Sequence, residues 1–280
     1  MTERSYVAEQ VRRFDNDRFL CALFAPADRR EPLLTLYAFN VEIARIREMA
    51  REPLLGEMRL QWWCDAIAAI YAGSDPPHHP IAMPLAATIR RCYLTRSHFD
   101  GLLDARRLDL RDEPAATLEN LLAYADGTSA MLSLLALEAL GVRDPAIGDI
   151  ARVVGVAWAL TGLLRAVPYH ARMRRLYLPA DLLKDAGIDT ARLFDGRHQP
   201  ALRNVVRELA AHAQGLLDEA RRVDTPIERS ALTVLLPATL ADGYLARLAR
   251  GGFDPFDERL RSPAIGRYFR LAFNAWRGRF

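Results

Sequence analysis

The sequence predicts an all-α protein. Apolar residues recur at three- and four-residue spacing along most of the 280 residues, which is the period of a helix with one buried face. Period-two alternation of β-branched residues, the pattern of a strand, is almost absent. Prolines and glycines fall where the helical pattern stops, as at Gly73–Pro77 and Gly251–Gly252. We therefore expect a helical bundle without a sheet, and no repeat or long linker divides residues 1–280 into more than one domain.

The individual helices follow from the same periodicity. It is strongest in segments 33–49, 54–71 and 118–140. Further helices are expected at 14–24, 81–93, 96–108, 147–166, 201–223, 231–249 and 265–276. Asp144 before Pro145 is typical of an N-cap followed by proline at the first helical position. Proline inside a helix removes a hydrogen bond, so Pro168 should bend or end the helix near Val167 and turn His170 away from it.

The composition is that of a soluble globular protein. Hydrophobic residues make up 51% of the chain and charged residues 26%, which suffices for a sizeable core. The net charge of +3 is too small to indicate nucleic-acid binding. Cys21, Cys64 and Cys92 are far apart and form no Cys-x-x-Cys motif, so they indicate reduced thiols and not a zinc site or disulfides.

The sequence also predicts a location. No run approaches the roughly 18 apolar residues that span a bilayer, and residues 1–6 contain no apolar signal segment. We therefore expect a cytoplasmic protein.

Several short strings follow one another along the chain. Segment 36–48 contains Tyr-Ala-Phe-Asn-Val-Glu, and segment 163–170 reads Leu-Leu-Arg-Ala-Val-Pro-Tyr-His, followed by Tyr-Leu-Pro at 177–179. The others are Phe19–Pro26 with Arg29 or Arg30, Arg-Leu-Gln-Trp-Trp at 59–63, His79-Pro80, Asp104 with Asp109-Leu110, and Glu119–Tyr124. In this order the strings resemble the squalene/phytoene synthase family over roughly residues 13–280. The resemblance implies an isoprenoid-synthase-like helical bundle around a central cavity.

The resemblance also locates the family's metal ligands. Each of two helical segments in that family carries Asp-x-x-x-Asp, whose carboxylates share one helix face and hold Mg²⁺ on the substrate diphosphates. Here these positions fall on Ala44 and Glu48 in the first segment and on Ala166 and His170 in the second. Three of the four carboxylates are missing, so we expect no catalytic residue, no metal site and no cofactor.

Arginines stand beside the lost ligands. Arg45, Arg47 and Arg165 could bind phosphate directly, because guanidinium groups form bidentate hydrogen bonds with phosphate oxygens. An equally simple interpretation is that Arg45 and Arg47 face solvent or pair with Glu42 and Glu48 of their own helix.

Two tyrosines and one histidine complete the candidate site. Tyr37 and Tyr177 could line the cavity, although buried tyrosines with hydrogen-bonded hydroxyls are common in any core. His170 has no second histidine or carboxylate four residues away, which argues against a metal ligand or general base.

Some strings are similar to one branch of the family. The Tyr-Ala-Phe-Asn-Val-Glu, Arg-Leu-Gln-Trp-Trp and Leu-Leu-Arg-Ala-Val-Pro-Tyr-His strings resemble the mitochondrial complex I assembly factor and its alphaproteobacterial relatives. That resemblance implies a catalytically degenerate protein that assists assembly of NADH:ubiquinone oxidoreductase and contacts its subunits. The alternatives are an active prenyltransferase that condenses prenyl diphosphates, or a module that binds an isoprenoid or a phospholipid.

The C-terminal segment 261–280 alternates arginines with aromatic residues. Such a helix can lie peripherally on an anionic membrane surface, here the inner membrane. It can also pack an aromatic stripe on the core and leave its arginines in water. Phe269, Phe273 and Trp276 share one helix face, and this favours packing on the core.

Overall fold

The protein is helical throughout the part that the structure describes. The computed structural model describes residues 5–50, 52–197, 199–260 and 266–280, which contain sixteen α-helices and no strand. The α-helices are α1 (Tyr6–Phe14), α2 (Asn16–Ala22), α3 (Ala27–Ala44), α4 (Ile46–Met49), α5 (Pro53–Tyr71), α6 (Ala82–Cys92), α7 (Arg96–Arg107), α8 (Leu118–Ala125), α9 (Met131–Ala139), α10 (Pro145–Arg172), α11 (Ala180–Asp185), α12 (Thr190–Phe194), α13 (Leu202–Arg222), α14 (Arg229–Leu235), α15 (Pro237–Arg250) and α16 (Arg267–Arg277). The predicted all-α class is confirmed.

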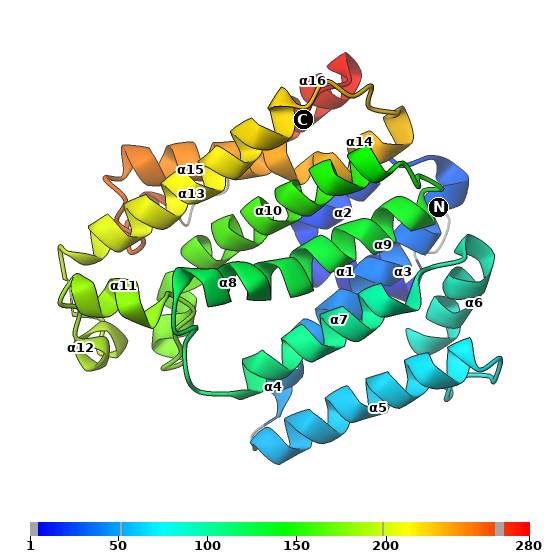
Figure 1. Cartoon of the computed structure of the whole chain (residues 1–280), viewed down its shortest axis with the longest axis horizontal. Coiled ribbons are helices and arrows are strands. Elements are labelled where there is room, and N and C mark those ends of the chain that lie inside the picture. The colour runs from blue at the N-terminus through cyan, green and yellow to red at the C-terminus, as the bar shows by residue number, and fades with distance from the viewer. Residues whose placement is uncertain (1–4, 51, 198, 261–265) are drawn as a thin grey trace.

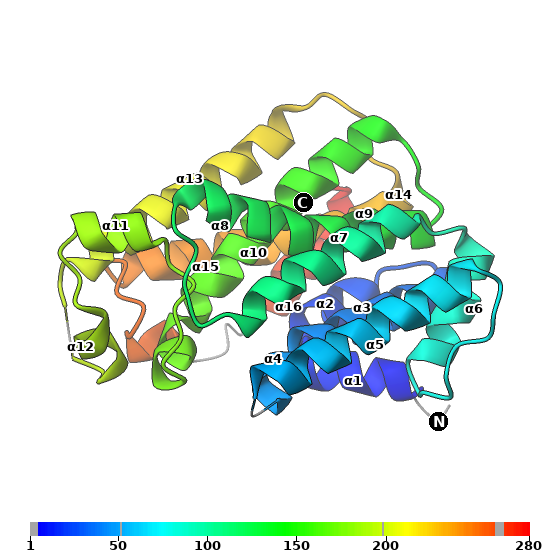
Figure 2. The same ribbon diagram turned by 60° about the horizontal axis from the view of Figure 1, so that its bottom comes forward.

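The long helices lie roughly side by side (Figure 1). Helix α10 occupies the centre and packs against α9, α13 and α15, while α3 packs against α1, α6 and α9. Helix α9 joins the two groups, because it contacts both α10 and α3, and α7 lies between α9 and α5. The view in Figure 2 shows α1 and α5 along the opposite side of the molecule from α13.

Helix α10 is central because its apolar residues cover more than one face. Ala151 and Leu160 are both buried although they point about 180° apart around the helix, and Val154 and Ala157 between them are buried as well. By length and composition α10 could cross a membrane, which the sequence analysis did not anticipate. However, 56% of its apolar window is buried inside the protein, as expected for a core helix.

The expected break at Pro168 is wrong. Helix α10 continues through Pro168 to Arg172. Pro168 lies in the penultimate turn, and both Val167 and Ala171 are buried against neighbouring helices. Tertiary packing therefore holds the last turn in spite of the lost hydrogen bond.

Four predicted helices are divided, one of them, at 118–140, by a π-helical segment. The helix predicted at 231–249 is interrupted at Leu236, between α14 and α15. The helix predicted at 33–49 is interrupted at Arg45, between α3 and α4. The helix predicted at 14–24 is interrupted at Asp15, whose side chain accepts a hydrogen bond from the Arg18 backbone N–H and caps α2. The short helices α11 and α12 were not predicted, because five or six residues carry too little periodicity.

The predicted helix at 118–140 contains a π-helical segment, η2 (Asp126–Ala130), between α8 and α9. Gly127 lies within it, and a Cβ there would come within 2.7 Å of the Ala105 Cβ on α7. This glycine therefore permits the close packing of η2 on α7.

The interpretation of the C-terminal aromatics as core residues is also wrong. Phe269, Phe273 and Trp276 of α16 are 78%, 52% and 78% exposed. Leu271, on the opposite face, is the residue that α16 buries. The start of this segment, residues 261–265, lies outside the described residues. So do residues 1–4, which belong to the stretch tested above for a signal segment.

Candidate functional site

The two motif segments face one another across a cavity. The Tyr169 hydroxyl on α10 donates a hydrogen bond of 2.9 Å to Glu48 Oε1 on α4. Beside this contact lies a cavity of about 380 Å³, to whose lining Ala44, Glu48 and His170 contribute. Ala166 instead lines a neighbouring cavity of about 490 Å³. Three of the four positions given by the family alignment therefore meet at one place.

A buried carboxylate lies at the wall of the 380 Å³ cavity. Asp109 belongs to the 3-10 turn η1 (Leu108–Leu110) and is 6% exposed. Its carboxylate accepts hydrogen bonds from Arg106 Nη1 at 3.0 Å, the Tyr124 hydroxyl at 2.7 Å and the Tyr177 hydroxyl at 3.0 Å. Burial raises the pKa of both tyrosines, and the negative charge of Asp109 raises it further. Both hydroxyls therefore stay protonated and act as donors.

The same cluster connects helices that are distant in sequence. Arg106 Nη2 also donates to Asn40 Oδ1 on α3, at 3.3 Å. Arg175, in the loop after α10, donates from Nη2 to the backbone carbonyl of Asp109 at 3.3 Å. Helices α3 and α7 and the loop after α10 are thus joined around Asp109.

His170 points toward this cluster, contrary to the expectation that Pro168 would turn it away. Its ring centroid lies 4.5 Å from that of Tyr177. The pKa of His170 is lowered from 6.5 to about 4, chiefly by burial, which outweighs the opposing effect of Asp109, with a smaller contribution from the charge of Arg175. The imidazole is therefore neutral at neutral pH.

The arginines near the first motif separate in space. Arg47 lines the 380 Å³ cavity and donates from Nη2 to Asp112 Oδ1 at 2.7 Å. Arg45 is not among the lining residues; its Nε lies 3.5 Å from Glu48 Oε2 and its guanidinium lies 3.7 Å from the Phe14 ring centroid. The pairing with Glu48 that the sequence left open is thus observed for Arg45, although Arg45 lies between two helices.

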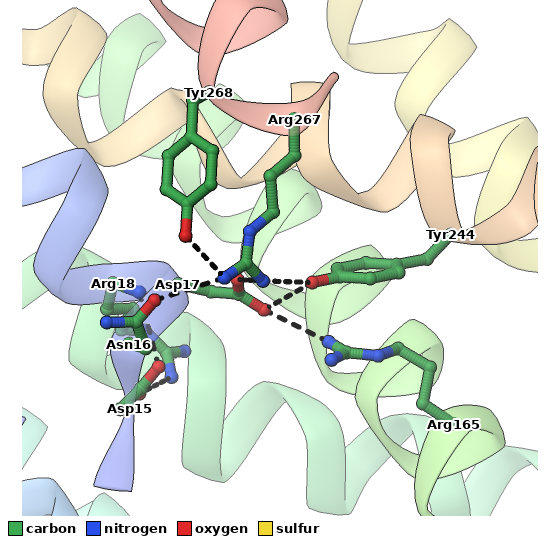
Figure 3. A network of polar contacts seen from close by, with 8 residues as sticks. All are labelled: Asp15, Asn16, Asp17, Arg18, Arg165, Tyr244, Arg267 and Tyr268. Carbon is green, nitrogen blue, oxygen red and sulfur yellow. Dashed lines mark hydrogen bonds and ion pairs between the residues drawn. The ribbon is translucent and has the colours of Figure 1, made fainter. Parts of the chain in front are cut away.

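Arg165 belongs to a different group, which we call the Asp17 cluster (Asp17, Arg165, Tyr244 and Arg267; Figure 3). Arg165 Nη1 lies 3.1 Å from Asp17 Oδ2, and its guanidinium lies 3.5 Å from the Tyr244 ring centroid. It lines the 490 Å³ cavity together with Ala166. Tyr37 is 2% exposed, lies beside Arg18 and lines neither the 380 Å³ cavity nor the 490 Å³ cavity.

The residues around the 380 Å³ cavity do not fit Mg²⁺. Its two carboxylates already accept hydrogen bonds, Glu48 from Tyr169 and Asp109 from three donors. Mg²⁺ requires near-octahedral oxygen ligands, and cationic neighbours oppose it. Within the described part of the chain, no group of three or more His, Cys, Asp or Glu residues could hold a metal ion. Three arginines line the cavity, which therefore suits an anion better than a cation.

Sequence reasoning missed several of these lining residues. Asp109 and Tyr124 did stand in family strings, and Arg106 lies three residues before Asp109, a spacing typical of helical ion pairs. Tyr169 stood in a family string too, but neither it nor Arg175 was predicted to line the cavity, because their contacts depend on how the end of α10 meets α4 and η1.

Comparisons with known proteins agree with this geometry. The chain is 32% identical over 275 residues to the NADH dehydrogenase (ubiquinone) complex I assembly factor 6 of Bos taurus, which covers 98% of this chain and 82% of that protein. The crystal structure of squalene synthase HpnC from Alicyclobacillus acidocaldarius superimposes with a TM-score of 0.77 at 22% identity, covering 89% of this chain and 94% of that one. A dehydrosqualene synthase solved with a ligand gives a TM-score of 0.82 at 19% identity, covering 98% and 95%. Because the squalene/phytoene synthase model also matches residues 11–267, the chain belongs to that family.

Proposed function

We propose that this protein is a catalytically degenerate squalene/phytoene synthase-like protein that acts as an assembly factor for respiratory complex I. The observation that carries the proposal is the state of the former metal site. Ala44 and His170 stand at the cavity where the family has aspartates, and the remaining Glu48 is bonded to Tyr169. The choice of complex I comes from the Bos taurus relative, which matches 98% of the chain and is named a complex I assembly factor.

This role implies protein partners and a place in the cell. We propose that subunits of the NADH:ubiquinone oxidoreductase bind the protein during assembly. We place it in the cytoplasm, working peripherally at the inner membrane, because complex I is assembled in a membrane. Nucleic acid is not expected as a partner, since the net charge is only +3.

Co-purification tests the partner directly. A tagged full chain, isolated from its own cells after mild crosslinking, should enrich complex I subunits over the subunits of succinate dehydrogenase, as measured by mass spectrometry. Equal enrichment of the two complexes would contradict the proposal. An unrelated tagged helical protein serves as the control.

A second proposal follows from the arginines of the 380 Å³ cavity. Arg47, Arg106 and Arg175 suit a phosphate-bearing ligand, either a prenyl diphosphate or a phospholipid head group, bound without metal. Tyr177 lies beside them and offers apolar surface. Such a module would bind an isoprenoid or a lipid without converting it.

Calorimetry in EDTA tests this second proposal. Farnesyl diphosphate should give a binding heat that R47A and R175A together abolish. R45A should leave it unchanged, because Arg45 does not line the cavity. The absence of heat at millimolar ligand, or an equal loss in R45A, would exclude the binding site proposed here.

A further inference from the structure

Helix α16 presents an aromatic face to solvent. Phe269, Phe273 and Trp276 are 78%, 52% and 78% exposed. With 3.6 residues per turn, the three side chains lie within an arc of about 60° on the helix. Single exposed apolar residues are normal, but a contiguous group of large aromatics indicates an interaction surface. Figure 1 shows α16 at the upper edge of the molecule.

The opposite face of α16 is fixed to the protein. Arg267 Nη1 donates to Asp17 Oδ1 at 3.1 Å, and Figure 3 shows Arg267 reaching from α16 into the Asp17 cluster. Leu271 is 1% exposed, and Asn274 Nδ2 donates to Thr239 Oγ1 on α15 at 2.9 Å. The aromatic face cannot turn inward without breaking these contacts, so it is held outward by the fold.

Positive charge borders the aromatic face. Arg270 and Arg277 lie on one side of it, at about 80–100° from Phe269 around the helix. Both are exposed, and no carboxylate among the described residues forms an ion pair with either. Arg279 follows in the same segment and is also exposed.

A small basic cavity adjoins this border. Its volume is about 120 Å³, and it lies between α15 and α16. Four arginines contribute to its lining, namely Arg247, Arg250, Arg267 and Arg270. No acidic side chain of the described residues lines it. Arg267 Nε is buried without a hydrogen-bond acceptor in the described part of the chain.

We propose that α16 docks the protein on an anionic phospholipid surface. The three aromatic side chains enter the interfacial region of the bilayer, and Arg270 and Arg277 bind lipid phosphates. A helix with apolar aromatics on one face, arginines at its border and a rigid back has the features of an interfacial helix. The inference deepens the peripheral location given under the proposed function, but it needs no complex I subunit.

A second exposed apolar group differs from α16 in the charge that surrounds it. Leu54 and Met58 on α5 are 67% and 62% exposed. Exposed Glu52 and Arg59 also lie beside them, and exposed Glu57 pairs with Arg107, so this surface carries both signs of charge and an anionic bilayer attracts it less. It provides a matched control, with similar apolar exposure and without the excess of positive charge.

Vesicle flotation of the full chain tests the proposal. The protein should float with vesicles of phosphatidylcholine and phosphatidylglycerol, stay unbound with phosphatidylcholine alone, and dissociate at high salt. F269A/W276A should lower the partition coefficient more than tenfold, whereas L54A/M58A should leave it unchanged. R270Q/R277Q should lower it roughly tenfold or more, and R59Q/R222Q, which removes two exposed arginines elsewhere, should not.

Tryptophan fluorescence gives an independent readout. Trp276 is exposed, whereas Trp63 and Trp158 are buried and Trp62 is partly buried. Anionic vesicles should therefore shift the emission to the blue, and W276F, which keeps an aromatic ring, should float normally without that shift. Circular dichroism should show an unchanged helical fold in every variant, because all substituted side chains are exposed.

Three results would overturn the proposal. They are no flotation with anionic vesicles, equal flotation with neutral vesicles, and loss of flotation in L54A/M58A instead of F269A/W276A. The first of these is also what a protein partner on this face would produce. Each result is separate from the complex I experiments, so either proposal can fail while the other stands.

Discussion

Asp17 is the residue on which the packing of the C-terminal part depends most. Its carboxylate accepts hydrogen bonds from Arg165 on α10, Tyr244 on α15 and Arg267 on α16. D17N removes the negative charge that pairs with Arg165 and Arg267. We expect the free energy of unfolding to fall by about 3 kcal/mol, at the lower end for a broken buried pair because Arg165 is partly exposed.

D112N is the matched control for D17N in urea denaturation. Asp112 also pairs with an arginine, Arg47 at 2.7 Å, but its side chain is 75% exposed. Exposed pairs contribute less than about 1 kcal/mol. Equal losses of stability in the two variants would contradict the importance given to Asp17.

His170 makes stability depend on pH. Its pKa of about 4 in the folded protein lies below 6.5, so the unfolded chain binds more protons between these values. The contribution of the neutral His170 imidazole to the free energy of unfolding is thus fully present above pH 6.5 and is lost as the pH falls toward 4. H170Q should flatten this part of the curve of unfolding free energy against pH. H78Q, which changes an exposed histidine, should not, and identical curves for H170Q and the wild type would be the contrary result.

Restoring aspartates should not restore chemistry. Ala44 lines the 380 Å³ cavity but Ala166 lines its neighbour, so A44D/A166D does not direct two new carboxylates at one point. Arg47 and Arg106 would also oppose a divalent cation at the first position. Incubation with labelled farnesyl diphosphate, Mg²⁺ and a reductant should give no squalene-type product from the wild type or this variant. Formation of such a product would support the active prenyltransferase instead.

Among the elements, α10 offers the sharpest test of packing. A Cβ on Gly155 would meet Ala130 Cα of η2 at 2.8 Å, and backbone cannot move aside cheaply. G155A should therefore destabilise the protein by about 1–3 kcal/mol. Gly162 lies on the same helix with nothing within 4 Å, so G162A should be neutral or stabilising by up to about 1 kcal/mol. Thermal unfolding compares them, and similar midpoints would contradict the close contact of α10 with η2.

The same elements show what the sequence can and cannot predict. Periodicity located the long helices, because burying one face of a helix requires apolar residues at that spacing. It could not show that α10 continues through Pro168, because that turn is stabilised by the tertiary packing of the buried Val167 and Ala171. For α16, periodicity placed Phe269, Phe273 and Trp276 on one face, but only the packing of Leu271 reveals that this face is outside.

The candidate site was predictable only in part. Aligned strings brought Ala44, Glu48 and His170 correctly to one cavity. Arg45 and Arg165 do not line this cavity. Arg45 pairs with Glu48 from outside it, and Arg165 pairs with Asp17 and lines the neighbouring cavity together with Ala166.

At the scale of the whole molecule, the family fold is retained and the charge of its metal site is changed. Helices α3, α4, α7 and α10 still surround a cavity, but arginines and bonded carboxylates occupy the place of metal ligands. A protein that keeps the fold of the family without its metal ligands can still bind partners, which suits a role in assembly.

The most direct measurement is the amount of assembled complex I in cells that lack this chain, determined on native gels with an NADH-oxidation stain. We predict a severalfold decrease that the wild type restores, and that E48Q restores as well because no chemistry depends on this carboxylate. Succinate dehydrogenase in the same membranes should be unchanged. Normal complex I without the chain, or rescue by the wild type but not by a folded E48Q, would contradict a role in assembly without catalysis.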